Sequence, residues 1–304
     1  MSASSTSPTP PRSRLIGCLL AGALGDAIGD HFDGRAHASE FVIPTELRIT
    51  DDTQLTLATC EAITATGAVH PEAIADRFVH WFRNRRINGI GSSTLKALTE
   101  LEAGGHWALV GATGERSAGN GAAMRVAPLA FFLDPDRDTD RQTLRDVSRI
   151  THRNEEAYVG ALAMVRAIRH LLAGNHLDES LLCSLVNSLP DSRVRDRLQE
   201  VQHTSPSISE YVSRFSASGF VADSVPLAVL AAIRSADYLS GIEAIVRCGG
   251  DTDTNASMFG QLFGAAFGMD AVPRSLSNSS EDISAVRRTA EDLAAVLEAR
   301  DHAP

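Results

Sequence analysis

Residues 247–268 read "RCGGDTDTNASMFGQLFGAAFG" and combine a glycine turn, two acids and a helical pattern rich in small residues. Gly249 and Gly250 allow the backbone to turn sharply just before the helix begins. Asp251 and Asp253 alternate along the entry, so both carboxylates can face one centre. Small residues along the helix favour close packing against another helix. The stretch therefore predicts a tightly packed helix with an acidic site at its start.

Helix capping and a calcium loop both compete with a metal site of this kind. Acids and threonines at a helix start can accept hydrogen bonds from free backbone N–H groups, which is simple capping. The D-x-D-x-N opening also resembles a calcium-binding EF-hand loop. That loop needs glycine at its sixth position and glutamate at its twelfth, where this chain has Ala256 and Leu262. We exclude the EF-hand and keep capping as the alternative.

A second acidic helix start lies far upstream, in "RITDDTQLTLATCEAI" at residues 48–63. Asp51 and Asp52 stand side by side where an apolar helical pattern begins. One acid is enough for capping, and a second adjacent carboxylate adds repulsion unless a cation relieves it. Capping remains the alternative here as well.

Considered together, the two helix starts offer ligands with oxygen atoms only. The side chains are those of Thr50, Asp51, Asp52, Asp251, Asp253 and Thr254. Oxygen-only sets suit hard cations such as Mg²⁺, Mn²⁺ or Ca²⁺. Four carboxylates carry more charge than one Mg²⁺ neutralises, so the set favours two ions, which at roughly 3.5–4 Å can share a bridging water.

Two glycine-containing turns are candidate ligand loops. In "SAGNGAAMRVAPLAFF", residues 117–132, a Gly-Asn-Gly turn precedes a helical pattern, which is typical of a phosphate cradle. The third glycine of a dinucleotide fingerprint and the Gly-Lys-Ser/Thr of a P-loop are both missing, so a plain turn is the alternative. Residues 87–98, "INGIGSSTLKAL", have the same character.

The composition of the 304-residue chain, 43% hydrophobic and 22% charged, is typical of a soluble globular protein. The net charge of −10 argues against nucleic acid as a partner. No apolar run approaches the ~20 residues of a membrane span, so we expect no membrane partner.

The four cysteines, Cys18, Cys60, Cys183 and Cys248, form no C-x-x-C pair. We expect them to be buried free thiols in a reducing, cytoplasmic compartment.

Helical periodicity dominates the sequence. Apolar spacings of three and four predict helices over 15–29, 53–66, 72–83, 92–103, 121–132, 141–150, 155–173, 179–188, 222–237, 253–268 and 281–299. Only residues 41–49 carry a weak strand pattern, and residues 175–220 are expected to include a polar surface excursion. The Ser/Thr/Pro-rich residues 1–14 are expected to be a disordered tail. We therefore predict a single all-α domain, an orthogonal helical bundle, over residues 15–299.

Five stretches, taken in order, resemble the ADP-ribosylglycohydrolase family. They are "GCLLAGALGDAIGD" (17–30), "TDDT" (50–53), "GNGAAMRVAPLA" (119–130), "THRNEEAYVGAL" (151–162) and "GGDTDTNASMFGQLFGAAFG" (249–268). The resemblance implies that family's all-α fold, with two Mg²⁺ ions in a cleft, Mn²⁺ being possible. It also favours a core helix at residues 15–30, although Arg12 and Arg14 before this apolar run imitate a signal peptide.

The resemblance implies an activity and partners. The reaction would be hydrolysis of the bond between C1″ of ADP-ribose and a modified side chain, so the partners would be ADP-ribose and an ADP-ribosylated protein or peptide. The implied metal ligands are the same six oxygen-bearing residues. The implied catalytic residues are Asp51, Asp52, Asp251 and Asp33. The implied substrate-binding residues are Ser117, Gly119, Asn120, Gly121, Met124, His152, Gly89, Gly91 and Phe220.

Two places depart from the family pattern. Asp33 stands where the pattern G-D-A-x-G-x-x-x-E has a glutamate, which is one methylene longer. Arginine-directed members have an acid where this chain has Asn88 or Gly89, and a tyrosine where it has Phe220. Arginine and serine linkages therefore both stay open. His152 taken alone is ambiguous, because a lone histidine before a helix is more often a capping or packing residue. The alternative functions are a non-catalytic ADP-ribose-binding protein and a two-metal hydrolase of another ribosyl or nucleotide compound.

Overall fold

The structure, a computed structural model, describes residues 11–34 and 41–301. Within these residues the chain forms thirteen α-helices, four short 3₁₀ helices and no β-strand, which confirms the predicted all-α fold. The α-helices are α1 (Pro11–Asp30), α2 (Asp51–Thr66), α3 (Pro71–Arg83), α4 (Ser92–Glu102), α5 (Asp138–Arg149), α6 (Glu155–Leu172), α7 (Glu179–Ser188), α8 (Arg193–Thr204), α9 (Ile208–Phe215), α10 (Val221–Arg234), α11 (Tyr238–Cys248), α12 (Thr252–Phe267) and α13 (Glu281–Asp301). The 3₁₀ helices are η1 (Glu115–Ser117), η2 (Asn120–Ala122), η3 (Ala127–Phe131) and η4 (Gly268–Ala271).

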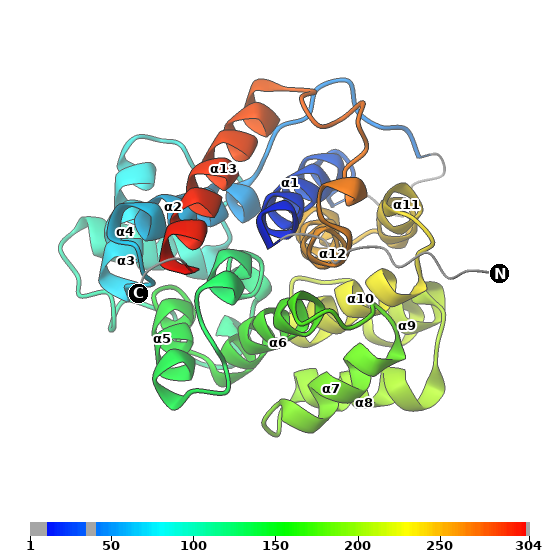
Figure 1. The fold of residues 1–304 in the computed structure, drawn as a ribbon. Helices are drawn as coiled ribbons and strands as arrows, with labels where there is room; N and C mark the ends of the chain where they lie inside the picture. The colour runs from blue at the N-terminus through cyan, green and yellow to red at the C-terminus, as the bar shows by residue number, and fades with distance from the viewer. Residues whose placement is uncertain (1–10, 35–40, 302–304) are drawn as a thin grey trace.

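Helices α1 and α12 lie side by side at the centre of the molecule and run in opposite directions (Figure 1). Their backbones touch, because a Cβ atom on Gly25 would lie 2.1 Å from the carbonyl oxygen of Ala256. In the same way, a Cβ atom on Gly260 would lie 2.2 Å from the carbonyl oxygen of Ala21. Glycine is therefore required on both helices, as the small-residue pattern predicts.

The other helices surround this central pair (Figure 1). Helix α13 packs on α1 and α2, while α6, α10 and α11 pack on α12. Residues 15–29 of α1 are all buried, so this helix lies in the core. No helix in the described part of the chain is long and apolar enough to cross a membrane.

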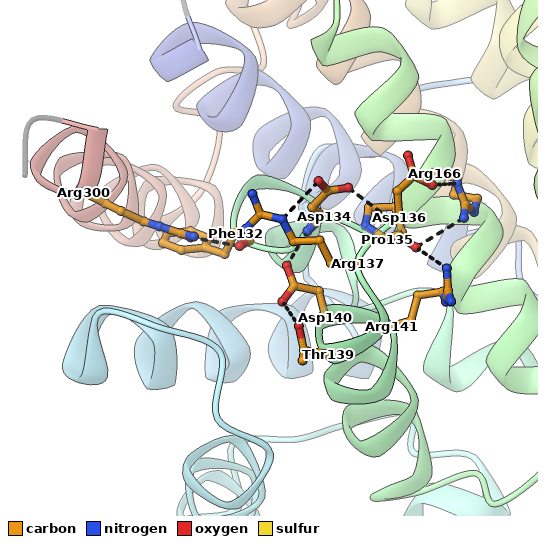
Figure 2. A network of polar contacts seen from close by, with 10 residues as sticks. All are labelled: Phe132, Asp134, Pro135, Asp136, Arg137, Thr139, Asp140, Arg141, Arg166 and Arg300. Carbon is orange, nitrogen blue, oxygen red and sulfur yellow. Dashed lines mark hydrogen bonds and ion pairs between the residues drawn. The ribbon is translucent and has the colours of Figure 1, made fainter.

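The turn after η3 ties separate helices together (Figure 2). From α6, Arg166 donates a hydrogen bond to Asp136 at 2.8 Å. From α13, Arg300 donates to the carbonyl oxygen of Phe132 at 2.9 Å. Asp136 is largely exposed, so its ion pair adds little to stability. These contacts mainly fix the path of the chain between η3 and α5.

The N-terminal boundary differs from the prediction. Helix α1 begins at Pro11, so residues 11–14 are helical and not part of a disordered tail. Proline suits the first turn of a helix because its missing N–H would have no partner there. Ser13 also anchors this turn, since its hydroxyl oxygen accepts a hydrogen bond from the N–H of Met269 at 3.1 Å. The rest of the predicted tail, residues 1–10, lies outside the described residues.

The predicted α-helix over residues 121–132 is wrong. The chain forms two separate 3₁₀ helices there, η2 and η3. Pro128 explains the interruption, because proline lacks an N–H and disfavours helical backbone in the residue before it. Residues 41–49, predicted as a weak strand, form no strand.

Within residues 175–220, α7 lies at the predicted helix 179–188, but the remaining predicted surface excursion is instead mostly helical, as α8 and α9. Its serines begin helices: the side chain of Ser192 caps α8 and that of Ser207 caps α9. Helix α11 was also not predicted. The expectation of buried thiols holds for Cys18 and Cys60, but Cys183 is exposed and Cys248 is half-buried.

Candidate active site

Segments far apart in the sequence meet around one cavity of about 340 Å³. They are the starts of α2, α4 and α12, the turn after α1 and the glycine loop at η2. The predicted site residues that line the cavity are Asp33, Asp51, Asp52, Gly89, Gly91, Gly119, Asn120, Gly121, Met124, His152, Asp251, Asp253 and Thr254. The structure thus brings both acidic helix starts and both glycine turns to one place.

Asp26, fully buried near the end of α1, organises the start of α2. Its Oδ1 atom accepts a hydrogen bond from the hydroxyl of Thr50 at 2.7 Å. Its Oδ2 atom accepts from the backbone N–H groups of Thr50 at 3.0 Å and Thr53 at 3.2 Å. Burial raises the pKa of Asp26 to about 6, although these hydrogen bonds oppose the shift. Because Asp26 and Thr50 satisfy the first turn, Asp51 and Asp52 are not needed as caps.

Asp251 does not cap its own helix either. It is the N-cap residue of α12, yet its side chain accepts no hydrogen bond from that helix. Its Oδ2 atom accepts instead from the side-chain Nδ2 of Asn120 at 2.6 Å. Its backbone N–H donates to the carbonyl oxygen of Ala217 at 2.9 Å. Capping therefore does not explain Asp51, Asp52 or Asp251, whereas Asp253 accepts the N–H of Thr254 at 2.7 Å.

Asp52 and Thr254 join the two acidic helix starts. The hydroxyl of Thr254 donates a hydrogen bond to Oδ2 of Asp52 at 3.0 Å. The second oxygen of Asp52, Oδ1, is buried and has no hydrogen-bond partner among the described residues. A buried carboxylate oxygen without a donor is costly, and a bound cation would satisfy it.

Asp33 reaches the acids of α12 in spite of its short side chain. One carboxylate oxygen from each of Asp33, Asp251 and Asp253 lies within 4.8 Å of the other two. Burial and then repulsion from Asp251 raise the pKa of Asp33. An aspartate at this position is therefore long enough to join the acidic cluster.

Crowding of the acids changes their protonation. Burial, followed by repulsion from neighbouring acids, raises the pKa of Asp51 to about 7 and that of Asp253 to about 10. The same causes raise the pKa of Asp52 well above its ordinary value. Divalent cations would replace the protons that the acids otherwise retain. The oxygen-only ligands, the unpartnered Asp52 oxygen and this repulsion all fit Mg²⁺ or Mn²⁺.

The glycine loop lies directly against His152. A Cβ atom on Gly121 would lie 2.7 Å from Cε1 of the His152 ring, so only glycine fits without a shift. The loop is fixed by the N–H of Asn120, which donates to the carbonyl oxygen of Gly219 at 3.0 Å. Gly89 needs its glycine for another reason, a positive φ of 78°.

Three predicted residues do not line the cavity: Thr50, Ser117 and Phe220. Thr50 is turned toward Asp26, and its oxygen also accepts the N–H of Asp52 at 3.4 Å. The hydroxyl of Ser117 donates to the carbonyl oxygen of Thr113 at 2.9 Å and serves the local turn. Phe220 is the N-cap residue of α10 and lies near Arg197, whose guanidinium carbon is 5.7 Å from the ring centre.

Sequence reasoning missed Asp26, Arg116 and Gly219. Arg116 and Gly219 line the cavity. Asp26 does not, but its carboxylate accepts hydrogen bonds from Thr50 and Thr53 at the start of α2. Asp26 did carry a signal, because a charged residue inside an apolar helix requires a buried partner. Arg116 in η1 and Gly219 in the loop before α10 stand in no sequence pattern that relates them to the acids.

This combination of an all-α fold and an acid-lined cavity belongs to a class of enzymes, hydrolases of glycosidic bonds. The chain belongs to the ADP-ribosylglycohydrolase family, whose sequence profile matches residues 7–303. The resemblance drawn from five short stretches is therefore confirmed.

Individual relatives cover most of the chain. An uncharacterized protein of Archaeoglobus fulgidus is 28% identical over 268 residues, which span 82% of this chain and 86% of the relative. The ADP-ribosylarginine hydrolase Tri1 of Pseudomonas putida is 28% identical, over 88% of this chain and 74% of its own. The ADP-ribosylhydrolase ARH3 of Gallus gallus is 25% identical, over 93% of each chain.

A solved structure described as an ADP-ribosylglycohydrolase-related protein complex has the same fold. It superposes with a TM-score of 0.77 at 25% identity, covering 94% of this chain and 98% of that one.

Proposed function

We propose that this protein is a metal-dependent ADP-ribosyl hydrolase that cleaves the bond between C1″ of ADP-ribose and a protein side chain. Family membership supports ADP-ribosyl hydrolysis in general. The observation that carries the proposal further is the acidic cluster, in which Asp51, Asp52 and Asp251 do not cap their helices and the buried Oδ1 of Asp52 has no partner among the described residues.

Two Mg²⁺ ions, or Mn²⁺, would be held by Thr50, Asp51, Asp52, Asp251, Asp253 and Thr254, with Asp33 beside Asp251 and Asp253. Such ions would supply positive charge that polarises the ribose hydroxyls and lowers the pKa of water. Thr50 stays a candidate ligand because its oxygen keeps a free lone pair beside the N–H of Asp52.

Carboxylates of this chain would accept the proton that the attacking water loses. One of Asp51, Asp52 and Asp251 takes the proton from the water that attacks C1″. Asn120 already donates to Asp251, and Thr254 already donates to Asp52. Asp51 accepts no side-chain hydrogen bond within residues 11–34 and 41–301, so its carboxylate is the freest to act. The remaining carboxylates stabilise positive charge that develops at C1″.

Uncharged and cationic groups of the cavity would hold the diphosphate. The N–H groups of Gly119 and Gly121, on either side of Asn120, and the uncapped start of α4 at Gly91 would serve as donors. Arg116 adds a guanidinium to the same cavity. These groups explain how a chain with a net charge of −10 accepts an anionic ligand.

The test is release of ADP-ribose from arginine-, serine- and glutamate-linked peptides, each with Mg²⁺ and with EDTA. We expect release from one peptide type and loss of that release in EDTA. Asp251→Asn should lower kcat/KM by about 100-fold or more, while the melting temperature stays close to that of the unmodified protein. Asp30→Asn is the matched control, because Asp30 is an exposed acid that does not line the cavity. This variant should keep full activity.

Three outcomes would contradict the proposal. Undiminished release in EDTA would exclude a required metal, and full activity of Asp251→Asn would exclude its assigned role. Absence of release from every peptide, with ADP-ribose still bound in calorimetry, would identify a non-catalytic binding protein.

A further inference from the structure

His152 lies in the wall of the cavity with only 3% of its surface exposed. The glycine loop lies close to its ring, with no room for a side chain at Gly121. A Cβ atom on Gly119 would lie 3.3 Å from Nε2, and one on Gly121 would lie 2.7 Å from Cε1. The position of the ring is thus fixed by backbone, which leaves its protonation as the property that decides what it can bind.

The second ring nitrogen, Nδ1, faces a buried polar chain. The hydroxyl oxygen of Thr151 lies 2.8 Å from Nδ1 of His152. Arg125, which is fully buried, donates from its Nη2 group to the same oxygen at 2.7 Å. The Nη1 group of Arg125 donates to the carbonyl oxygen of Gly121. Arg125 therefore connects the glycine loop to Thr151 and, through it, to His152.

The direction of each hydrogen bond in this chain follows from chemistry. A guanidinium can only donate, so the Thr151 oxygen accepts from Arg125. Thr151 is fully buried, and Nδ1 is the only acceptor near its hydroxyl proton in the described part of the chain. If Nδ1 carried a proton, that hydroxyl proton would be buried without an acceptor, which is disfavoured. The hydroxyl therefore donates to Nδ1.

The ring is neutral. Burial, together with the nearby charge of Arg125, lowers the pKa of His152 to about 3. A neutral imidazole has one ring proton, and since Nδ1 accepts, that proton is on Nε2. Within residues 11–34 and 41–301, Nε2 has no hydrogen-bond partner, while the ring lines the cavity.

We propose that Thr151 and Arg125 are positioning residues that hold His152 as the Nε2–H tautomer, so that the ring donates one hydrogen bond to an acceptor oxygen of the bound ligand. The identity of that ligand, ADP-ribose, rests on the function proposed above, whereas the tautomer does not. A phosphoryl or ribose oxygen fits this donor, and a ligand group that can only donate does not.

The first test is the NMR spectrum of the full chain labelled with ¹⁵N in its histidine rings. The chain has 10 histidines, and the resonances lost in His152→Gln assign the ring of interest. At pH 7.5 we expect an unprotonated Nδ1 and a protonated Nε2. Thr151→Val removes the hydroxyl and should mix the two tautomers, while Thr151→Ser should restore the original pattern.

Two NMR results would overturn the inference. One is a protonated Nδ1 or an averaged signal in the unmodified protein, which needs no variant to fold. The other is an unchanged tautomer in folded Thr151→Val.

The second test is ADP-ribose binding in the presence of Mg²⁺, measured by calorimetry. Thr151→Val should weaken binding by about tenfold, the effect of one lost polar contact, and Thr151→Ser should keep the dissociation constant within about threefold. With a peptide substrate, KM should rise more than kcat falls. Equal affinity of all three proteins would overturn the role in binding. If the unmodified protein bound no ADP-ribose, the proposed function would fail, while the NMR result would still decide the tautomer.

Discussion

At the scale of single residues, the site depends on buried ionisable side chains whose pKa values are shifted by their surroundings. His152 shows this most simply, because its pKa of about 3 is below the ordinary value of 6.5. Burial is the main cause and Arg125 the second. Asp52 shows the opposite case, since burial and four nearby acids raise its pKa.

His152 predicts a specific pH dependence of stability. The unfolded chain binds a proton at His152 below about pH 6.5, whereas the folded chain does not until about pH 3. Above pH 6.5 the residue has no effect, and stability is lost progressively as the pH falls from 6.5 toward 3. At pH 5 the loss is about 2 kcal/mol. His152→Gln cannot take up this proton, so it should gain about 2 kcal/mol relative to the unmodified protein between pH 8 and pH 5.

Urea unfolding of both proteins at pH 8 and pH 5 measures this difference. The acids of the cavity also titrate, but they are present in both proteins and largely cancel. Parallel pH profiles of the two proteins would show that His152 is protonated in the folded state.

Asp26 predicts an effect that combines stability with metal affinity. Asp26→Asn would replace one of the two acceptor oxygens by an NH2 donor, so the hydroxyl of Thr50 and the N–H groups of Thr50 and Thr53 could not all keep their acceptors. We expect a loss of about 1–2 kcal/mol in the free energy of unfolding and a 10–100-fold weaker Mg²⁺ affinity, on the order seen for groups that orient metal ligands. Calorimetric titration with Mg²⁺ measures the second effect.

Asp178→Asn is the control for Asp26→Asn. Asp178 accepts the N–H of Ser180 at the start of α7, and asparagine caps a helix about as well as aspartate. It should leave both quantities unchanged. An unaltered Mg²⁺ affinity in Asp26→Asn would show that Asp26 only stabilises the fold.

At the scale of helices, the sequence predicted the strongly periodic elements and failed where other signals decide the structure. The helices α2, α6 and α12 begin and end within two residues of the predicted bounds. Pro128 interrupts an apolar run that periodicity alone reads as continuous. Helices α8 and α9 are amphipathic but mostly polar, and their serines resemble loop residues until their capping role is seen.

The contact between α1 and α12 predicts a stability effect of one methyl group. Gly25→Ala would place its Cβ 2.1 Å from the Ala256 carbonyl oxygen, which is backbone and cannot turn aside. The helices must separate, so we expect a loss of about 1–3 kcal/mol in urea unfolding. Gly91→Ala is the control, because nothing lies within 4 Å of its added Cβ and its φ is −65°. A variant Gly25→Ala as stable as Gly91→Ala would contradict the packing.

At the scale of the whole molecule, the sequence identified most residues of the cavity but not their partners. Two acidic helix starts were recognisable because each has its own local pattern. The hydrogen bonds from Thr50 to Asp26 and from Asn120 to Asp251 join separate elements, and only the fold brings them together. For the same reason, local patterns could not show that Thr50 and Ser117 turn away from the cavity.

Metal binding should stabilise the entire fold, because the predicted ligands come from both α2 and α12. With free Mg²⁺ at about 100 times its dissociation constant, the gain is about 2.7 kcal/mol and the melting temperature should rise by about 5 °C. EDTA should reverse the rise. Scanning calorimetry measures both changes, and Asp251→Asn should respond less. Equal melting temperatures in Mg²⁺ and EDTA would speak against a metal site at these acids.

The pairing of α1 with α12 also has a consequence during synthesis of the protein. The hydroxyl of Thr252 bonds to the carbonyl oxygen of Gly29, 223 residues earlier. A nascent chain that has not yet emerged as far as α12 has an apolar first helix without its partner and only half of the acidic cluster. Contacts of such long range form late. Until α12 has been synthesised, the glycine-lined face of α1 stays without its partner helix, and any metal site that needs ligands from both α2 and α12 stays incomplete.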